Sequence, residues 1–185
     1  MKKWMYFCFG CIVLLTIYIN KTAIICMGEI SYDLRDLEDG FEKKVRILLA
    51  KMEKKYTISV RSVYRSNTCQ DRIYAISQRV EKVTGMTITT QKGGTSCHNH
   101  AIKGVPASLA VDVRPFLFSI QGHVDFYKEL EKEANKMGLR TGASFADGKR
   151  KNPWRKYDLG WDPGHIDIGK AACVAKLRKM PSSKK

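Results

Sequence analysis

The sequence predicts an α+β fold, a single domain in which a small, mainly antiparallel sheet is flanked by helices and preceded by an N-terminal hydrophobic export segment. The chain has 185 residues, of which 44% are hydrophobic and 28% charged, so it is long enough for one core and too short for several. Helical and strand patterns are mixed without a regular βαβ repeat. We find neither an internal repeat nor a glycine-rich nucleotide-binding loop.

Residues 1–27 have the pattern of an export segment. Lys2 and Lys3 precede an apolar run from Trp4 to Ile19. This run is longer than a usual cleaved apolar region and shorter than the roughly 20 residues that span a bilayer comfortably. Because no clear small-residue cleavage site follows, residues 1–27 are either a cleaved signal peptide or a retained signal anchor that attaches the protein to a membrane. Both alternatives place the chain from residue 28 onward outside the cytoplasm.

The six cysteines divide equally between the leader and the exported part, as Cys8, Cys11 and Cys26 against Cys69, Cys97 and Cys173. Three thiols cannot all pair with one another, so the exported part can form one disulfide in an oxidising compartment. The spacing does not decide which two cysteines would pair.

The exported part opens with a helical lead-in over residues 28–55. Apolar side chains recur there at helical spacing between Asp33 and Lys55, which predicts an amphipathic helix. Residues 56–65 alternate between apolar and polar side chains and predict a half-buried strand. Thr68 can then cap a second helix, which Gly85 ends.

The remaining elements lie within the main domain, residues 56–180. A Gly-rich loop spans residues 92–96, and Gly138 marks the end of the third helix. We expect strands at residues 86–90, 107–113 and 165–168, helices at 122–137 and 170–179, and a flexible tail at 181–185.

The formal net charge of +15 predicts attraction to polyanions, whether nucleic acid, acidic lipid or an anionic cell wall. Nucleic acid is the least favoured of these partners. The exported part has no basic recognition helix, zinc finger or aromatic RNA-binding motif, and export would separate the protein from nucleic acid.

A candidate metal site emerges from the placement of the histidines. A catalytic zinc ion needs about three protein ligands and an open position for water. His98, Asp112 and His165 can supply those ligands. Asp162, three residues before His165, can serve as the carboxylate that moves the proton, because Pro163-Gly164 bends the chain and turns both side chains toward one pocket.

Spacing alone also permits ordinary structural roles for these residues. His98 could be a solvated loop residue, and Asp112 could simply close a strand. His165 could be a hydrogen-bonded histidine at a strand start, and Asp162 could accept in an Asx turn before Pro163. His123 lies beside a predicted helix N-terminus, where a structural role is favoured.

Five elements in a fixed order resemble the family of zinc D-alanyl-D-alanine carboxypeptidases and L-alanyl-D-glutamate endopeptidases. This family includes phage endolysins and the vancomycin-resistance D,D-peptidases, and its fold is related to the hedgehog signalling domain. The resemblance covers roughly residues 56–168. The elements are Ser59 to Ser66, Gln70 with Ile73-Tyr74-Ala75, Ile88 to Asn99, Leu109 to Val113, and Trp161 to His165.

The resemblance implies a role for each matching residue. His98, Asp112 and His165 would be the zinc ligands, and Asp162 would be the catalytic base. Arg65 would bind the scissile carbonyl oxygen or a substrate carboxylate, which suits a guanidinium placed where negative charge develops. A further residue, Ser96, would hydrogen-bond the substrate backbone, whereas Gln70 and Tyr74 would pack around the site.

One departure from the family concerns the connection between His98 and Asp112. Residues 99–111 intervene where the family has a short connection, and Ser108 stands where the family has a glycine. An insertion at about His100 to Pro106 would explain the extra length. It leaves open whether His98 or His100 binds the metal, although Asn99 favours His98.

The sequence therefore predicts an exported zinc metallopeptidase of the bacterial cell envelope or periplasm that hydrolyses peptidoglycan stem peptides. Residues 56–180 would form the zinc peptidase domain, and the basic surface would hold it on the anionic cell envelope. The alternative is a non-catalytic zinc-containing module that binds the envelope, because the hedgehog relatives show that the metal site can persist without peptidase activity.

Overall fold

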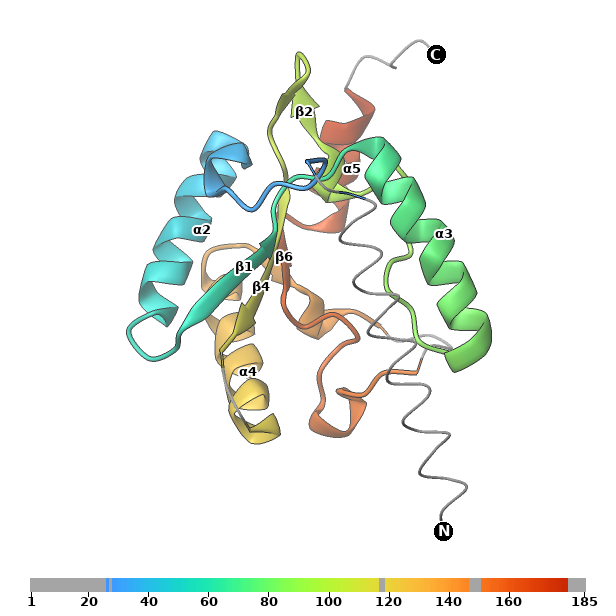
Figure 1. Cartoon of the computed structure of the whole chain (residues 1–185). Coiled ribbons are helices and arrows are strands. Elements are labelled where there is room, and N and C mark those ends of the chain that lie inside the picture. The colour runs from blue at the N-terminus through green and yellow to red at the C-terminus, as the bar shows by residue number, and fades with distance from the viewer. Residues whose placement is uncertain (1–25, 27, 117–118, 147–150, 180–185) are drawn as a thin grey trace.

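The computed structural model of the chain describes residue 26 and residues 28–116, 119–146 and 151–179 (Figure 1). The predicted export segment, apart from Cys26, and the predicted tail lie outside these residues. Within the described part, no helix is long and apolar enough to span a membrane.

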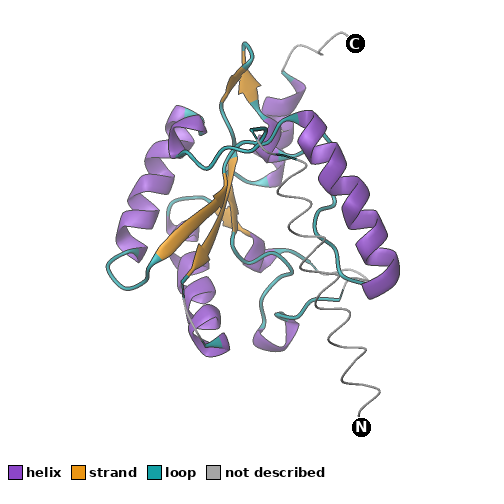
Figure 2. Cartoon of the chain, viewed as in Figure 1, coloured by secondary structure: helices purple, strands orange, loops and turns teal. Residues whose placement is uncertain are grey.

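The described residues form an α+β domain with a small antiparallel sheet, which confirms the predicted fold class (Figure 2). Neighbouring strands in the sheet are antiparallel throughout, in the order β1 (Ile58–Ser62), β4 (Ala110–Pro115), β6 (His165–Asp167) and β5 (Arg140–Thr141). The α-helices are α2 (Asp39–Met52), α3 (Asn67–Thr84), α4 (Ile120–Lys136) and α5 (Lys170–Arg178).

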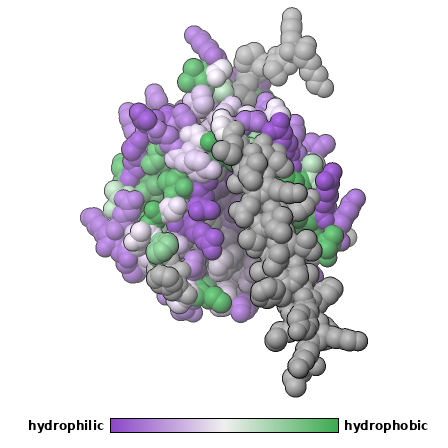
Figure 3. Space-filling model, viewed as in Figure 1, coloured by the Kyte–Doolittle hydropathy of each residue, from purple (hydrophilic) through white to green (hydrophobic). Residues whose placement is uncertain are grey.

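The main core lies on one side of the sheet, between the strands and helices α2 and α4. Helix α3 lies apart from this core, to the right in Figure 1, and packs on a smaller apolar cluster. On the described part of the face shown in Figure 3, hydrophilic residues predominate and apolar residues form smaller patches between them. The buried residues of the main core include Phe41, Val45, Leu48 and Met52 of α2, Val124, Phe126 and Leu130 of α4, and Val111, Val113 and Ile166 of the sheet.

The helix predicted between Asp33 and Lys55 is shorter in the structure, because the chain interrupts it near its start. A 3-10 turn at Leu34–Asp36 precedes α2. The backbone of Asp36 and Glu38 then bonds Ser108, and the Glu38 side chain caps α2 by accepting a hydrogen bond from Phe41 N. The apolar spacing therefore predicted the helix correctly but not its first residue.

Residues 86–90 form no strand, contrary to the prediction from their composition. The backbone N–H groups of Ile88 and Thr89 donate to Ser77 Oγ at 2.9 and 3.0 Å, and Ser77 Oγ donates to the Thr89 carbonyl. A side chain of α3 thus takes the hydrogen bonds that a neighbouring strand would have made.

Two disulfides occur in the described part of the chain, not one. Cys97 pairs with Cys173, and Cys26 pairs with Cys69. The prediction was wrong because it counted Cys26 with the apolar leader. In the structure this residue is buried against α3.

Candidate metal centre

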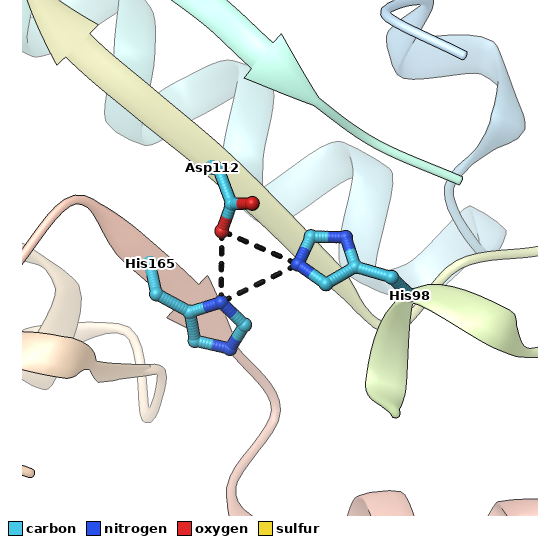
Figure 4. A group of neighbouring side chains, drawn as sticks. All are labelled: His98, Asp112 and His165. Carbon is cyan, nitrogen blue, oxygen red and sulfur yellow. Dashed lines mark hydrogen bonds and ion pairs between the residues drawn. The ribbon is translucent and has the colours of Figure 1, made fainter. Parts of the chain in front are cut away.

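Strand alternation brings Asp112 and His165 together on one face of the sheet. Val111, Val113 and Ile166 point into the core, so the residues between them point to the opposite face. In the antiparallel register, Asp112 pairs directly with His165. The Nδ1 atom of His165 lies 2.9 Å from Oδ1 of Asp112 (Figure 4). The same pattern that builds the core therefore positions the two polar groups.

His98 reaches the same point from a 3-10 turn at Cys97–Asn99, which begins after Ser96. Its Nδ1 donates to the Val63 carbonyl oxygen at 2.6 Å. Its Nε2 is therefore directed toward the pair, 3.2 Å from Asp112 Oδ1 and 3.4 Å from His165 Nδ1. The ring is buried, and the hydrogen bond to Val63 fixes which nitrogen can act as a ligand.

The three side chains fit a metal ion. One potential ligand atom from each of His98, Asp112 and His165 lies within 4.8 Å of the other two. Among the residues that the structure describes, no other group of three or more His, Cys, Asp or Glu residues has this geometry. Two imidazoles and one carboxylate, facing an open cleft that could hold a water, are typical of a catalytic zinc site.

The surrounding charges favour a cation at this position. Burial acts to lower the pKa of His165, but its hydrogen bonds to Asp112 and Asp167 outweigh burial and raise that pKa to about 10. Burial also opposes ionisation of Asp112, yet His98 and Arg65 hold its pKa well below the usual range. At His98 burial dominates and lowers the pKa. A metal ion would supply the positive charge that the carboxylates stabilise.

Arg65 lies beside the cluster and not on the open surface. Its Nη2 forms an ion pair with Asp112 Oδ2, and its Nε donates to Ser62 Oγ at 2.8 Å. The buried Gln70 side chain accepts from Nη1 at 3.4 Å. The sequence predicts only a packing role for Gln70. In the structure its side chain also helps to hold the Arg65 guanidinium.

Asp162 lies on the turn before His165 and lines the same cleft as His98, Asp112 and His165. His165 N donates to the Asp162 carbonyl oxygen at 3.1 Å. A Cβ atom at Gly142 would lie 1.7 Å from that oxygen, so only glycine fits beneath the turn. Burial and the negative charge of Asp112 raise the pKa of the Asp162 carboxyl to about 6.

The cleft has a volume of about 860 Å³ and runs between the open face of the sheet and the segments around α3. Ser96 lines it, and its Oγ accepts a hydrogen bond from His98 N at 3.3 Å, which makes it the cap of the turn. Besides Arg65, three cationic side chains of the sheet line the cleft: Arg61, Arg114 and Arg140.

The extra residues after His98 form a separate hairpin, with strands β2 (Ala101–Ile102) and β3 (Val105–Pro106), which projects at the top of Figure 1. Leu109 N donates a hydrogen bond to the Cys97 carbonyl oxygen at 3.0 Å, so the segments before and after the hairpin lie next to each other. His100 is buried at its base, with Nδ1 2.6 Å from the Ala107 carbonyl. Of the two candidate histidines, His98 is the one in the cluster.

Two residues at the site were not among the sequence candidates. Asp167 is buried, and its Oδ2 lies 3.2 Å from His165 Nε2. Arg140 forms an ion pair with Asp167 from the neighbouring strand. The alternation of His165, Ile166 and Asp167 along β6 was a signal for the first residue, whereas nothing in the local sequence indicates the second.

The chain is similar to several solved structures at low sequence identity. No protein-family model and no curated protein matches the chain. Among solved structures, LdcB LD-carboxypeptidase is 18% identical over 77% of this chain, with a TM-score of 0.46. The vancomycin-resistance D,D-pentapeptidase VanY with Zn(II) is 18% identical over 77% of this chain and 79% of its own, with a TM-score of 0.48. VanYB with D-alanine-D-alanine is 17% identical over 77% of each chain, with a TM-score of 0.49.

These structures belong to the group of peptidases that the sequence motifs resemble. The chain spans 64% of the length of the LdcB structure. At such identities and TM-scores the likeness does not assign a function to this chain.

Proposed function

We propose that this protein is an exported zinc metallopeptidase that hydrolyses the stem peptides of bacterial peptidoglycan. The observation that carries the proposal is the convergence of His98, Asp112 and His165 from three separate segments at the floor of an open cleft. The five sequence elements in the family's order support the same reaction class. A zinc ion held by these residues would polarise the scissile carbonyl and lower the pKa of a bound water.

The protein's own residues have distinct roles in this reaction. Asp162 would accept a proton from the attacking water and pass it to the leaving amine, which requires a carboxylate that faces the cleft and does not bind the metal. Arg65 would donate to the oxygen that becomes negative as the carbonyl carbon turns tetrahedral. Ser96, whose hydroxyl proton is not used by the cap, would donate to the substrate backbone.

The cationic side chains of the cleft are suited to bind a substrate that carries carboxylates. Arg61 and Arg114 lie on the open face of the sheet, and neither has an ion-pair partner within the described ranges. Stem peptides end in a free carboxylate and carry others along their length. The two guanidinium groups would attract these groups and orient the peptide over the metal centre.

Export is supported by the two disulfides, because such bonds persist in oxidising compartments. Cys26 takes part in one of them, so a leader peptidase that preserves this bond would cut before residue 26. The net charge of +15 would hold the enzyme on the anionic envelope. Retention on purified cell walls should then fall as salt rises, and retention independent of salt would remove this part of the proposal.

Mass spectrometry of peptidoglycan fragments tests the activity. Residues 26–185, oxidised and loaded with zinc, would be incubated with purified fragments beside a chelator-treated sample and a His165→Ala variant. New fragments that disappear in both controls would support the proposal, and their masses would identify the bond. Intact fragments from a folded, zinc-loaded protein would contradict it.

A non-catalytic zinc module that binds the envelope is the second candidate. The observation that favours it is the ion pair between Arg65 and Asp112, which occupies the guanidinium assigned to the substrate. This candidate predicts that Asp162→Asn changes neither wall binding nor the fragments. The peptidase predicts a large loss of rate with zinc still bound.

A further inference from the structure

The hydrogen bonds of His165 extend beyond the metal centre to a second pair of residues, Asp167 and Arg140. His165 contacts Asp112 through Nδ1 at 2.9 Å and Asp167 through Nε2 at 3.2 Å, so the imidazole lies between two carboxylates. Asp112 belongs to the cluster that could hold the metal, whereas Asp167 lies at the opposite nitrogen and outside that cluster.

Asp167 is held firmly in this position. Its side chain is 1% exposed, and such a buried carboxylate needs several hydrogen bonds to offset the loss of water. Arg140 supplies two of them, from Nε at 3.0 Å and from Nη2 at 2.5 Å, and Gly169 N supplies a third at 2.7 Å. His165 Nε2 is the fourth donor.

The sheet register sets this arrangement. Arg140 on β5 pairs directly with Asp167 on β6, just as His165 on β6 pairs with Asp112 on β4. The Arg140 guanidinium also lies 4.6 Å from the centre of the Phe145 ring, and that ring is 5.5 Å from the His165 ring. The carboxylate and the aromatic ring thus restrain the imidazole from two sides.

We infer that Asp167, anchored by Arg140, is a positioning residue that keeps the proton of His165 on Nε2 and directs the lone pair of Nδ1 to the metal. An ionised carboxylate only accepts hydrogen bonds, so it requires a donor at Nε2. With that nitrogen protonated, neutral His165 presents Nδ1 as its ligand atom. His98 is oriented in the opposite sense, since Val63 accepts from its Nδ1 and leaves Nε2 for the metal.

This inference rests on the metal site of the proposed function and does not depend on peptide hydrolysis. It predicts the effect of Asp167→Asn, a substitution of nearly equal size. In the variant, Oδ1 can still accept from Gly169 N while the amide group faces His165, which places a donor against a donor. The zinc affinity should fall about 10- to 100-fold, as is usual when a partner behind a metal ligand is lost.

The experiment measures zinc affinity of the full disulfide-bonded protein by competition with a chelator, together with the visible absorption of the cobalt-loaded form. Glu133→Gln is the matched control, because Glu133 is a buried carboxylate of helix α4 that pairs with Lys51 of α2 and Lys136 of α4 and does not line the cleft. We expect weaker zinc binding and an altered cobalt spectrum in Asp167→Asn and wild-type values in the control. Equal affinities and spectra in both variants would overturn the inference.

A second measurement covers the case in which Asp167→Asn does not fold. Nitrogen-15 NMR of the zinc-loaded wild-type protein reports which imidazole nitrogen of His165 carries the proton. The inference predicts a protonated Nε2 and a metal-bound Nδ1, and the reverse would refute it. Neither result depends on hydrolysis, so a protein that binds zinc as predicted and leaves peptidoglycan intact would refute the proposed function alone.

Discussion

The two faces of the four-stranded sheet come from alternate residues of the same strands and differ in their chemistry. One face packs on α2 and α4, and the other lines the cleft. The first carries Val111, Val113 and Ile166, and the second carries Asp112, His165 and Asp167. Each of these three site residues is therefore next in sequence to a residue of the core. Substitutions one position apart should therefore change stability and metal binding separately.

The largest expected effect comes from the apolar face. Val111→Asp would place an unpaired carboxylate at a fully buried position, with a cost of several kcal/mol against a total stability of about 5–15 kcal/mol for a domain. We expect no cooperative unfolding transition by circular dichroism. A folded variant with near wild-type thermal stability would break the distinction between the two faces.

The neighbouring substitution Asp112→Asn should spare the fold and remove the metal. The side chain keeps its volume and is 20% exposed, but it loses the only anionic ligand of the cluster. Zinc affinity should fall by more than roughly 100-fold, which is the upper value for losing a residue that only hydrogen-bonds a metal ligand. The circular dichroism spectrum should not change. Undiminished zinc binding in a chelator competition assay would remove the proposed site.

The two disulfides are expected to differ in what they stabilise, because one holds the site and the other holds the fold. Cys97–Cys173 ties α5 to the turn that carries His98, whereas Cys26–Cys69 ties the start of the described chain to α3. Replacing either pair with serines should lower the free energy of unfolding by about 2–5 kcal/mol. Only loss of the first pair should also weaken zinc binding, as chelator competition would show. Equal effects on zinc would contradict this assignment.

A smaller effect is expected for Arg114, an exposed side chain that lines the cleft. Arg114→Ala should raise KM for a stem peptide several-fold and leave kcat nearly unchanged, because an exposed charge is worth about 1 kcal/mol. Arg46→Ala is the control, since Arg46 pairs with Glu42 on α2. Steady-state kinetics that show the same KM in both variants would exclude Arg114 from substrate binding.

Local sequence pattern predicted the fold class, whereas the cluster of His98, Asp112 and His165 was predicted only with the resemblance of five ordered motifs to a known peptidase family. Alternation along short strands indicated which residues face away from the core, and the turn at Pro163-Gly164 brought Asp162 to the cleft that His165 lines. These features depend on neighbours in sequence, which a single chain reveals directly.

The features that sequence could not supply depend on distant contacts. Arg140 meets Asp167 only through the register of β5 with β6, and Ser77 suppresses the expected strand at residues 86–90 from the opposite side of a turn. Cys26 was assigned to the leader because its apolar surroundings match one, and only its position beside Cys69 shows the disulfide. Such pairings are set by tertiary packing and not by local propensity.

The role of Asp162 as general base is tested by comparing zinc-loaded wild-type protein with Asp162→Asn on a synthetic stem pentapeptide, with bound zinc measured in the same samples. We predict one zinc ion per chain in both proteins and a turnover rate about 10²- to 10⁴-fold lower in the variant, the usual contribution of a general base. Equal rates, or no turnover by a wild-type protein that contains zinc, would contradict the account of this cleft as a metallopeptidase active site.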